Sequence, residues 1–121
     1  MKILIIDDSG VMRRIHMNAL RERNVDDADM IEAADGAQAL KLAHSESIDL
    51  FLVDWNMPRL DGLRLVQTLR AMDQYRETPI IMITSEAAKY NVVEAIKAGV
   101  TNYLVKPVKP NQIWEKIGKY F

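Results

Sequence analysis

Four short apolar runs of this chain each end in a polar side chain with useful chemistry. The runs cover residues 3–6, 50–53, 80–83 and 103–105, and they are followed by Asp7 with Asp8, by Asp54, by Thr84 and by Lys106. Continuous apolar runs of this kind are typical of strands buried on both faces of a parallel sheet. The carboxyl ends of such strands meet at one edge of the sheet, where open α/β folds bind ligands. The sequence therefore predicts one site there, built from three carboxylates, a hydroxyl and an ammonium group.

Extended and helical patterns alternate five times along the chain, and this alternation predicts the fold class. Strands are expected at residues 2–7, 29–33, 50–54, 80–84 and 102–105. Helices are expected after an N-cap at Asp8 or Ser9, after an N-cap at Asp35, after the Asp61-Gly62 turn, at residues 90–98 before Gly99, and at residues 109–120. Five β/α units favour a parallel sheet with helices on both faces and right-handed crossovers. Because 121 residues are too few for an eight-stranded barrel, we expect an open, doubly wound α/β sheet in one domain over residues 1–121.

The spacing of apolar residues in the helical segments predicts which helix faces are buried. The expected inward-facing residues are Met12, Ile15 and Ala19, then Leu40 and Ala43, then Leu65, Val66 and Leu69, and finally Ile113, Ile117 and Phe121. His16 and His44 each stand alone on a helical segment, and we expect both to be exposed to solvent. Arg13 and Arg14 follow the acid pair; they either reach it, reach a partner protein, or lie on a solvated helix face.

Overall composition narrows the classes of partner. The net charge is -1, which gives no reason to expect binding to nucleic acid or to an anionic membrane. The absence of cysteine excludes disulfides and thiolate metal sites, and it fits a reducing compartment. The first apolar run is too short for a signal peptide or a membrane span. We therefore expect a soluble cytoplasmic protein.

Three carboxylates at one sheet edge favour a site for a hard divalent cation. Asp7, Asp8 and Asp54 would repel one another unless positive charge lay among them, and Mg²⁺ prefers oxygen ligands. Asp54 directly follows four apolar residues, so we do not expect it to be an ordinary surface charge. Carboxylates can act as nucleophiles that form aspartyl phosphates, which makes Asp54 a candidate for that role. A cation and Lys106 would neutralise a transferring phosphoryl group, and Thr84 would donate a hydrogen bond to it. Taken singly, the same residues are also explained as a helix cap, a β-branched strand residue and a solvated strand end.

Four motifs carry a resemblance to a known family. They are Ile-Ile-Asp-Asp ending at Asp8, Val-Asp-Trp-Asn-Met-Pro around Asp54, Ile-Thr-Ser-Glu-Ala around Thr84, and Tyr-Leu-Val-Lys-Pro ending at Pro107. On these motifs the chain resembles, from end to end, the response-regulator receiver domains of bacterial two-component signalling. Within that family it is most similar to the single-domain chemotaxis response regulators, which share Met-Arg-Arg after the acid pair and Trp-Asn after the central aspartate. The resemblance implies a flavodoxin-like (βα)5 fold with strand order 2-1-3-4-5.

The resemblance also implies roles for the site residues. Asp54 would accept a phosphoryl group from a histidine kinase, and Mg²⁺ or Mn²⁺ would be held by Asp7, Asp8, Asp54 and the backbone carbonyl of Asn56. Thr84 and Lys106 would contact the phosphoryl group, and Tyr103 would turn inward as Thr84 moves. Dephosphorylation would be tuned by Asn56 and Glu86. The implied output surface comprises Lys89, Val92, Ile96, Tyr103, Trp114 and Lys116.

The implied activity is signalling rather than enzymatic turnover. The chemistry would be limited to autocatalytic phosphotransfer and autodephosphorylation. The partners would be a histidine kinase, a phosphorylation-dependent target such as the flagellar motor switch, and a phosphatase, with no nucleic acid or membrane and with the protein as a monomer. Family members usually hold the Lys-Pro bond cis; from the sequence alone, proline at position 107 makes that isomer accessible.

Several alternatives stay open at this point. Within the same family, the chain could be a phosphorelay intermediate or a receiver excised from a longer regulator. A small aspartyl-phosphate hydrolase of the haloacid-dehalogenase type also combines Asp, Thr and Lys, but it carries an Asp-x-Asp pattern on its first strand. The segment from Asp54 to Asn56 breaks that pattern. A nucleotide or flavin domain is disfavoured because no Gly-rich phosphate loop follows any predicted strand.

Overall fold

The computed structural model describes residues 1–55, 62–85 and 89–121, with residues 89–91 described by their backbone alone. One parallel sheet has the order β2-β1-β3-β4-β5; its strands are β1 (Ile3–Ile6), β2 (Met30–Ala33), β3 (Leu50–Asp54), β4 (Ile80–Thr84) and β5 (Asn102–Val105). The helices are α1 (Gly10–Arg21), α2 (Gly36–Ser45), α3 (Gly62–Ala71), α4 (Lys89–Ala98) and α5 (Pro110–Ile117), with 3-10 turns at η1 (Asp27–Asp29), η2 (Asp73–Tyr75) and η3 (Gly118–Tyr120). The predicted doubly wound α/β sheet and its strand order are confirmed, with β1 and β2 slightly shorter than expected.

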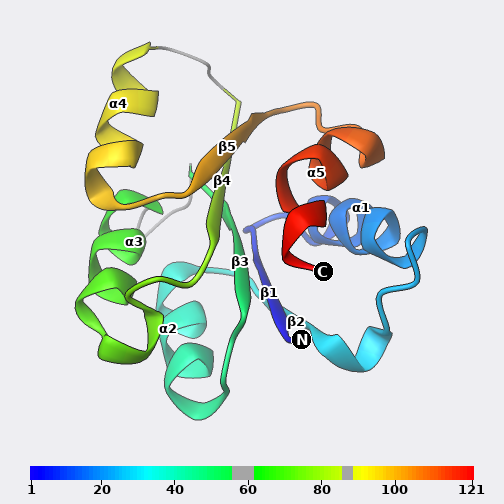
Figure 1. Ribbon diagram of the computed structural model, residues 1–121, viewed down its shortest axis with the longest axis horizontal. Helices are drawn as coiled ribbons and strands as arrows, with labels where there is room; N and C mark the ends of the chain where they lie inside the picture. The colour runs from blue at the N-terminus through cyan, green and yellow to red at the C-terminus, as the bar shows by residue number, and fades with distance from the viewer. Residues whose placement is uncertain (56–61, 86–88) are drawn as a thin grey trace.

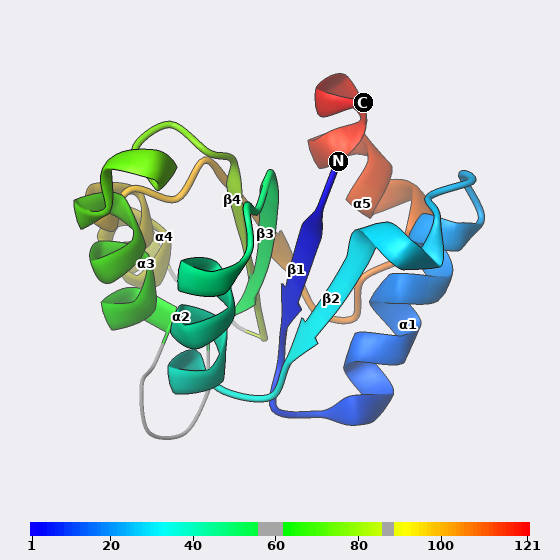
Figure 2. The same cartoon turned by 90° about the horizontal axis from the view of Figure 1, so that it is seen from below.

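Helices cover both faces of the sheet. The pair α1 and α5 packs on one face, and α2, α3 and α4 pack on the other (Figure 1); a view turned by 90° shows the same layers (Figure 2). Along β1, Leu4 and Ile6 belong to the core under α2, α3 and α4, whereas Ile3 and Ile5 belong to the core under α1 and α5. The strands β3 and β4 alternate in the same way and are buried throughout. Continuous apolar strands are therefore required here, because each face of the sheet has its own core.

Local hydrogen bonds mark the predicted helix ends. Ser9 Oγ accepts a hydrogen bond from the backbone N–H of Met12 at 3.2 Å, and Asp35 caps α2 through a 2.8 Å bond from the backbone of Gln38. Gly99 follows α4 with φ of 114°, a conformation that favours glycine. The α-helices contain 8 to 12 residues, and none within the described ranges is long and apolar enough to cross a membrane.

The buried face of α1 differs from the predicted one. His16 is only 1% exposed, whereas Ile15, which was predicted to face inward, is 43% exposed. The buried side chains of α1 are His16, Ala19 and Leu20, at positions i, i+3 and i+4 of one helix face. The prediction for both residues is wrong because the buried stripe is centred one residue further along the helix than the Met12–Ile15–Ala19 spacing suggested.

The other predicted helix faces are largely correct. Buried as predicted are Ala19, Ala43, Leu65, Val66, Leu69, Ile113 and Ile117; Met12 and Leu40 are half-buried, and His44 is exposed. Phe121 is the exception, at 52% exposure. Because α5 ends at Ile117 and a 3-10 turn follows, Phe121 leaves the helical register, and its ring lies 5.0 Å from that of Trp114.

Candidate functional site

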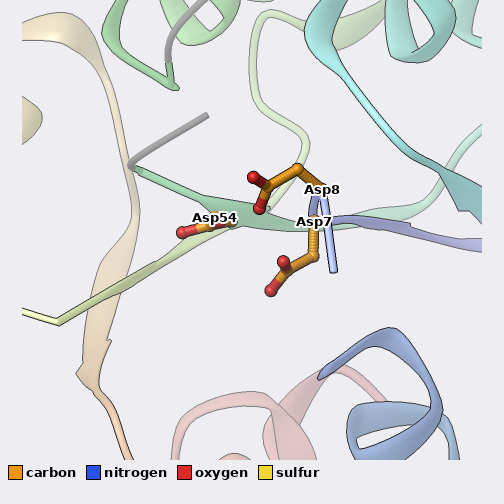
Figure 3. Close-up of side chains that lie close together, drawn as sticks. All are labelled: Asp7, Asp8 and Asp54. Carbon is orange, nitrogen blue, oxygen red and sulfur yellow. The ribbon is translucent and has the colours of Figure 1, made fainter. Parts of the chain in front are cut away.

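The carboxyl ends of β1 and β3 bring three aspartates together at one edge of the sheet. Asp7 and Asp8 follow β1, Asp54 ends β3, and their side chains lie close together (Figure 3). One carboxylate oxygen of each residue lies within 4.8 Å of the corresponding oxygens of the other two. Asp7 and Asp54 are 1% and 2% exposed, whereas Asp8 is exposed. The structure thus places the three predicted carboxylates in one cluster.

The turn between β1 and α1 fixes the orientation of Asp7. Its backbone N–H donates to the carbonyl oxygen of Ala33 in β2 at 3.1 Å, and its Oδ1 accepts a hydrogen bond from the backbone N–H of Ser9 at 2.9 Å. Its second carboxylate oxygen, Oδ2, is buried and has no hydrogen-bond partner among the described residues. One oxygen of Asp7 is therefore held by the turn, and the other faces the cluster as an acceptor.

Lys106, directly after β5, supplies the ammonium group. Its Nζ lies 3.2 Å from Asp54 Oδ1 and 3.7 Å from Asp7 Oδ2. Its backbone N–H donates to the carbonyl oxygen of Thr84 at 2.7 Å, and the Lys106–Pro107 peptide bond is cis, as the family resemblance implies. Among the described residues, one ammonium group lies against three carboxylates, so these four side chains carry an excess of negative charge.

This donor set fits a hard divalent cation. The side chains offer carboxylate oxygens, which Mg²⁺ and Mn²⁺ prefer as ligands. A buried acceptor without a hydrogen-bond partner, such as Asp7 Oδ2, is costly unless a cation or donor satisfies it. In the described part of the chain, no other group of three acidic or metal-ligating side chains converges in this way. Asn56, the fourth ligand implied by the family resemblance, lies outside the described residues.

Thr84 and Tyr103 lie on neighbouring strands and share one face of the sheet. Thr84 ends β4, is fully buried and pairs with Val105, while Tyr103 of β5 pairs with Met82. Met82 and Tyr103 pack in the core on the α4 side, and Thr84, two residues after Met82, points to the same face. Half-buried Tyr103 therefore lies on the same face of the sheet as Thr84, the last residue of β4, which lies at the acidic edge.

Part of the predicted output surface lies on the α4 side of the sheet. Ile96 is 58% exposed on α4, Val92 is half-buried on the same helix, and Tyr103 packs on the same side of the sheet. Outside the described residues lie Glu86 and the side chain of Lys89.

Trp114 of α5 is held against α1 instead. Its indole N–H donates to the carbonyl oxygen of Ala19 at 3.2 Å, and the guanidinium of Arg23 lies over its ring at 5.6 Å. Lys116, also on α5, is half-buried. The predicted output residues on α5 are thus not all directed toward α4.

Two basic side chains of α1 gain importance from the structure. Arg13, for which several roles were open, donates from Nη1 to the carbonyl oxygen of Asp7 at 2.6 Å. His16, which was expected in solvent, has no hydrogen-bond partner for either ring nitrogen among the described residues. Burial lowers the pKa of His16, Asp7 acts in the opposite direction, and Lys106 adds a smaller lowering. The sequence did contain one indication that His16 is buried: His16, Ala19 and Leu20 are spaced i, i+3 and i+4, which places them on one helix face.

The chain matches a known family over nearly its whole length. The family described as "response regulator receiver domain" matches residues 3–118, and the chain belongs to this family. It is therefore a phosphoacceptor signalling module rather than a conventional enzyme, and its three aspartates form the acidic site typical of receiver domains.

The comparisons also identify similar chemotaxis proteins. The chain is 45% identical to the "Chemotaxis protein CheY homolog" of Campylobacter jejuni, over 97% of this chain and 89% of that protein. It is 42% identical to the "Chemotaxis protein CheY" of Pseudomonas aeruginosa, over 100% of this chain and 96% of that protein. The solved structure of Vibrio cholerae CheY4 is similar with a TM-score of 0.90 at 32% identity, covering 99% of this chain and 98% of that one. These relatives favour the receiver interpretation over the hydrolase alternative.

Proposed function

We propose that this receiver domain, over residues 1–121, is a chemotaxis-type response regulator that carries its signal as a phosphoryl group on Asp54. The observation that carries the proposal is the position of Asp54, which is buried at the end of β3 between Asp7, Asp8 and the ammonium group of Lys106. Similarity to chemotaxis proteins supports the cellular setting. A phosphorelay intermediate or a receiver excised from a longer regulator would use the same chemistry.

Asp54 acts as the nucleophile. A carboxylate oxygen attacks the phosphorus of a phosphohistidine on the kinase, an O–P bond forms, the P–N bond breaks and the imidazole leaves. Lys106 Nζ, already 3.2 Å from Asp54 Oδ1, and the hydroxyl of Thr84 donate hydrogen bonds to the phosphoryl oxygens. Water later attacks the phosphorus, which releases inorganic phosphate and restores the carboxylate. Asn56 and Glu86, each two residues after a site residue, tune this hydrolysis.

Asp7, Asp8 and Asp54 hold Mg²⁺ or Mn²⁺, with the backbone carbonyl of Asn56 as a further ligand. The excess negative charge of the cluster and the unsatisfied Oδ2 of Asp7 support this assignment. When bound, the metal neutralises charge on the phosphoryl oxygens.

Phosphorylation changes the surface on the α4 side of the sheet. Thr84 is drawn toward the phosphoryl group, because its hydroxyl gains a charge-assisted hydrogen bond there. The movement makes room on the face that Tyr103 shares with Thr84, and Tyr103 turns inward as a shift between two populated states. The target, with the flagellar motor switch as the candidate, binds this face through Val92, Ile96 and Tyr103.

The protein works as a monomer in the cytoplasm, receives its phosphoryl group from a histidine kinase and loses it with help from a phosphatase. The remaining candidates for the output surface are Lys89, Lys116 and Trp114. Of these, Trp114 contributes least, because its indole is held by the backbone of Ala19.

The proposal is tested by metal-dependent phosphorylation. Protein incubated with a small-molecule phosphodonor and Mg²⁺ should acquire an acid- and base-labile phosphate, and a chelator should prevent it. Labelling that is equal with and without the chelator, or no labelling at any Mg²⁺ concentration, would contradict the proposal.

A further inference from the structure

We propose that Arg13 is a positioning residue for the metal site, acting through the peptide group that joins Asp7 to Asp8. This inference rests on the proposed function, in which these two carboxylates are metal ligands. Arg13 itself is a cation, so it is not a ligand. Its contribution is to hold the backbone from which both carboxylates project.

The guanidinium of Arg13 connects three elements. Its Nη1 donates to the carbonyl oxygen of Asp7 at 2.6 Å, at the end of β1, and its Nε donates to Glu32 Oε1 of β2 at 2.9 Å. The Arg13 side chain is 19% exposed; its bond to the Asp7 carbonyl oxygen is partly buried, whereas its bond to Glu32 is exposed. Because its backbone belongs to the first turns of α1, Arg13 joins the start of that helix to two adjacent strands.

The acceptor of the shorter bond explains the positioning role. The carbonyl oxygen of Asp7 belongs to the same planar peptide group as the backbone N–H of Asp8. Fixing that oxygen therefore fixes the plane that sets the direction of Asp8, while the Ser9 bond to Oδ1 fixes the side chain of Asp7. Asp8 is exposed, and its side chain accepts no hydrogen bond from the described residues. Its position in the carboxylate cluster therefore depends on this backbone.

The guanidinium group is required for this geometry. One planar fork reaches a carbonyl oxygen and a carboxylate at the same time, whereas a lysine ammonium is a point charge on a flexible stem. Arg13→Lys therefore keeps the charge and loses the double connection. Arg14, the next residue along, is exposed and provides a matched control on the same helix.

Charge and positioning predict opposite effects on metal affinity. If Arg13 acted only as a nearby positive charge, Arg13→Ala would bind Mg²⁺ more tightly and Arg13→Lys would leave the affinity unchanged. If it positions the two ligands, both variants bind Mg²⁺ more weakly, by about tenfold, as is typical when an outer partner of a metal ligand is removed.

The experiment is a Mg²⁺ titration of the full chain, followed by tryptophan fluorescence in a Trp114→Phe background so that Trp55 is the remaining reporter. It compares the parent protein with Arg13→Lys, Arg13→Ala, Arg14→Lys and Arg14→Ala in that background. We expect weaker binding in both Arg13 variants and wild-type affinity in both Arg14 variants. The Mg²⁺ concentration for half-maximal phosphorylation should rise in Arg13→Lys, while the rate at saturating Mg²⁺ stays at the wild-type value.

The outcomes separate this inference from the proposed function. Unchanged or tighter Mg²⁺ binding in Arg13→Lys, with a normal wild-type titration, would overturn the positioning role alone. A wild-type protein that does not respond to Mg²⁺ would overturn the proposed function itself. Melting without metal identifies variants that fail to fold, and because Arg13→Lys keeps the charge and the aliphatic stem, it decides the question if Arg13→Ala does not fold.

Discussion

Lys106 Nζ lies 3.2 Å from Asp54 Oδ1, although β4 separates the strands that carry these two residues. The lysine side chain therefore reaches across the end of β4, where Thr84 lies, to the carboxylate at the end of β3. Together with Asp7 and Asp8 after β1, the ends of four neighbouring strands meet at this edge. The ammonium group already lies beside the carboxylate that would receive the phosphoryl group.

The Lys106–Asp54 contact should stabilise the protein in the absence of metal. Replacing Lys106 by Met removes the ammonium group that lies beside the buried carboxylates of Asp7 and Asp54, and we expect the free energy of unfolding to fall by about 1.5–3 kcal/mol. Added Mg²⁺ should then stabilise Lys106→Met more than it stabilises the wild type, since the dication relieves a larger repulsion. Chemical denaturation with and without Mg²⁺ measures both effects; equal stability of the two proteins in a chelator would show that the contact contributes nothing.

Asp8 should show opposite effects with and without metal. In Asp8→Asn one negative charge is removed from a repelling cluster, so the metal-free protein should melt at the same or a higher temperature. The Mg²⁺-induced rise in melting temperature should be lost, because a metal that binds the native state stabilises it by an amount that grows with the logarithm of the ratio of metal concentration to Kd. Thermal melts across a range of Mg²⁺ concentrations provide the measurement. A wild-type-like response of Asp8→Asn would remove Asp8 from the metal site.

His16 should make stability depend on pH. Because burial lowers its pKa in the folded protein, the unfolded chain binds a proton first, at a pH of about 6.5. With respect to this group the folded protein is therefore most stable above that pH, and it loses stability as the pH falls below it, because the unfolded chain binds a proton that folded His16 does not. His16→Leu should flatten this part of the curve, and it should be about 1 kcal/mol more stable at pH 8, because two buried nitrogens without partners are removed.

The control for His16 is His44, which is exposed. Denaturant midpoints measured between pH 5 and pH 8 should show the wild-type slope in His44→Gln. If His16→Leu kept the full slope as well, other groups would account for the acid sensitivity.

Substitutions on the α4 side of the sheet should weaken target binding without slowing phosphorylation. Tyr103→Ala and Val92→Ala leave the acidic cluster intact, so both should be phosphorylated at the wild-type rate, whereas target affinity should fall by about tenfold, as expected for a truncated anchor residue. Trp114→Phe should affect binding less, since its indole contacts α1. Parallel assays of phosphorylation and target binding test this; normal binding in both alanine variants would place the output surface elsewhere, with α1 as the next candidate.

The strands and the convergence of the polar residues at their ends could be predicted from the sequence because the signals are local. The run from Ile80 to Ile83 is apolar at every position, since both faces of β4 are buried, and the polar residue that follows it, Thr84, then falls at the sheet edge. The side on which α1 is buried depends on how it packs against the sheet and α5. That is why Ile15 and His16 were assigned the wrong exposures.

Contacts between distant segments account for the rest. The bond from Trp114 to Ala19 spans 95 positions of the chain, and the bonds of Arg13 depend on the placement of β2 beside β1. No periodicity in the sequence reports such contacts. The sequence did supply the residue types, and the structure determined which of the open alternatives for Arg13 applies.

The central claim is that Asp54 is the phosphoacceptor, and mapping the phosphoryl group tests it most directly. The protein is incubated with a small-molecule phosphodonor and Mg²⁺, the acyl phosphate is trapped by reduction, and the modified position is located by mass spectrometry of peptides. The account predicts a single modification at Asp54, and none at any position in Asp54→Asn. Modification of Asp7 or Asp8 in the wild type, or undiminished labelling of Asp54→Asn, would contradict it.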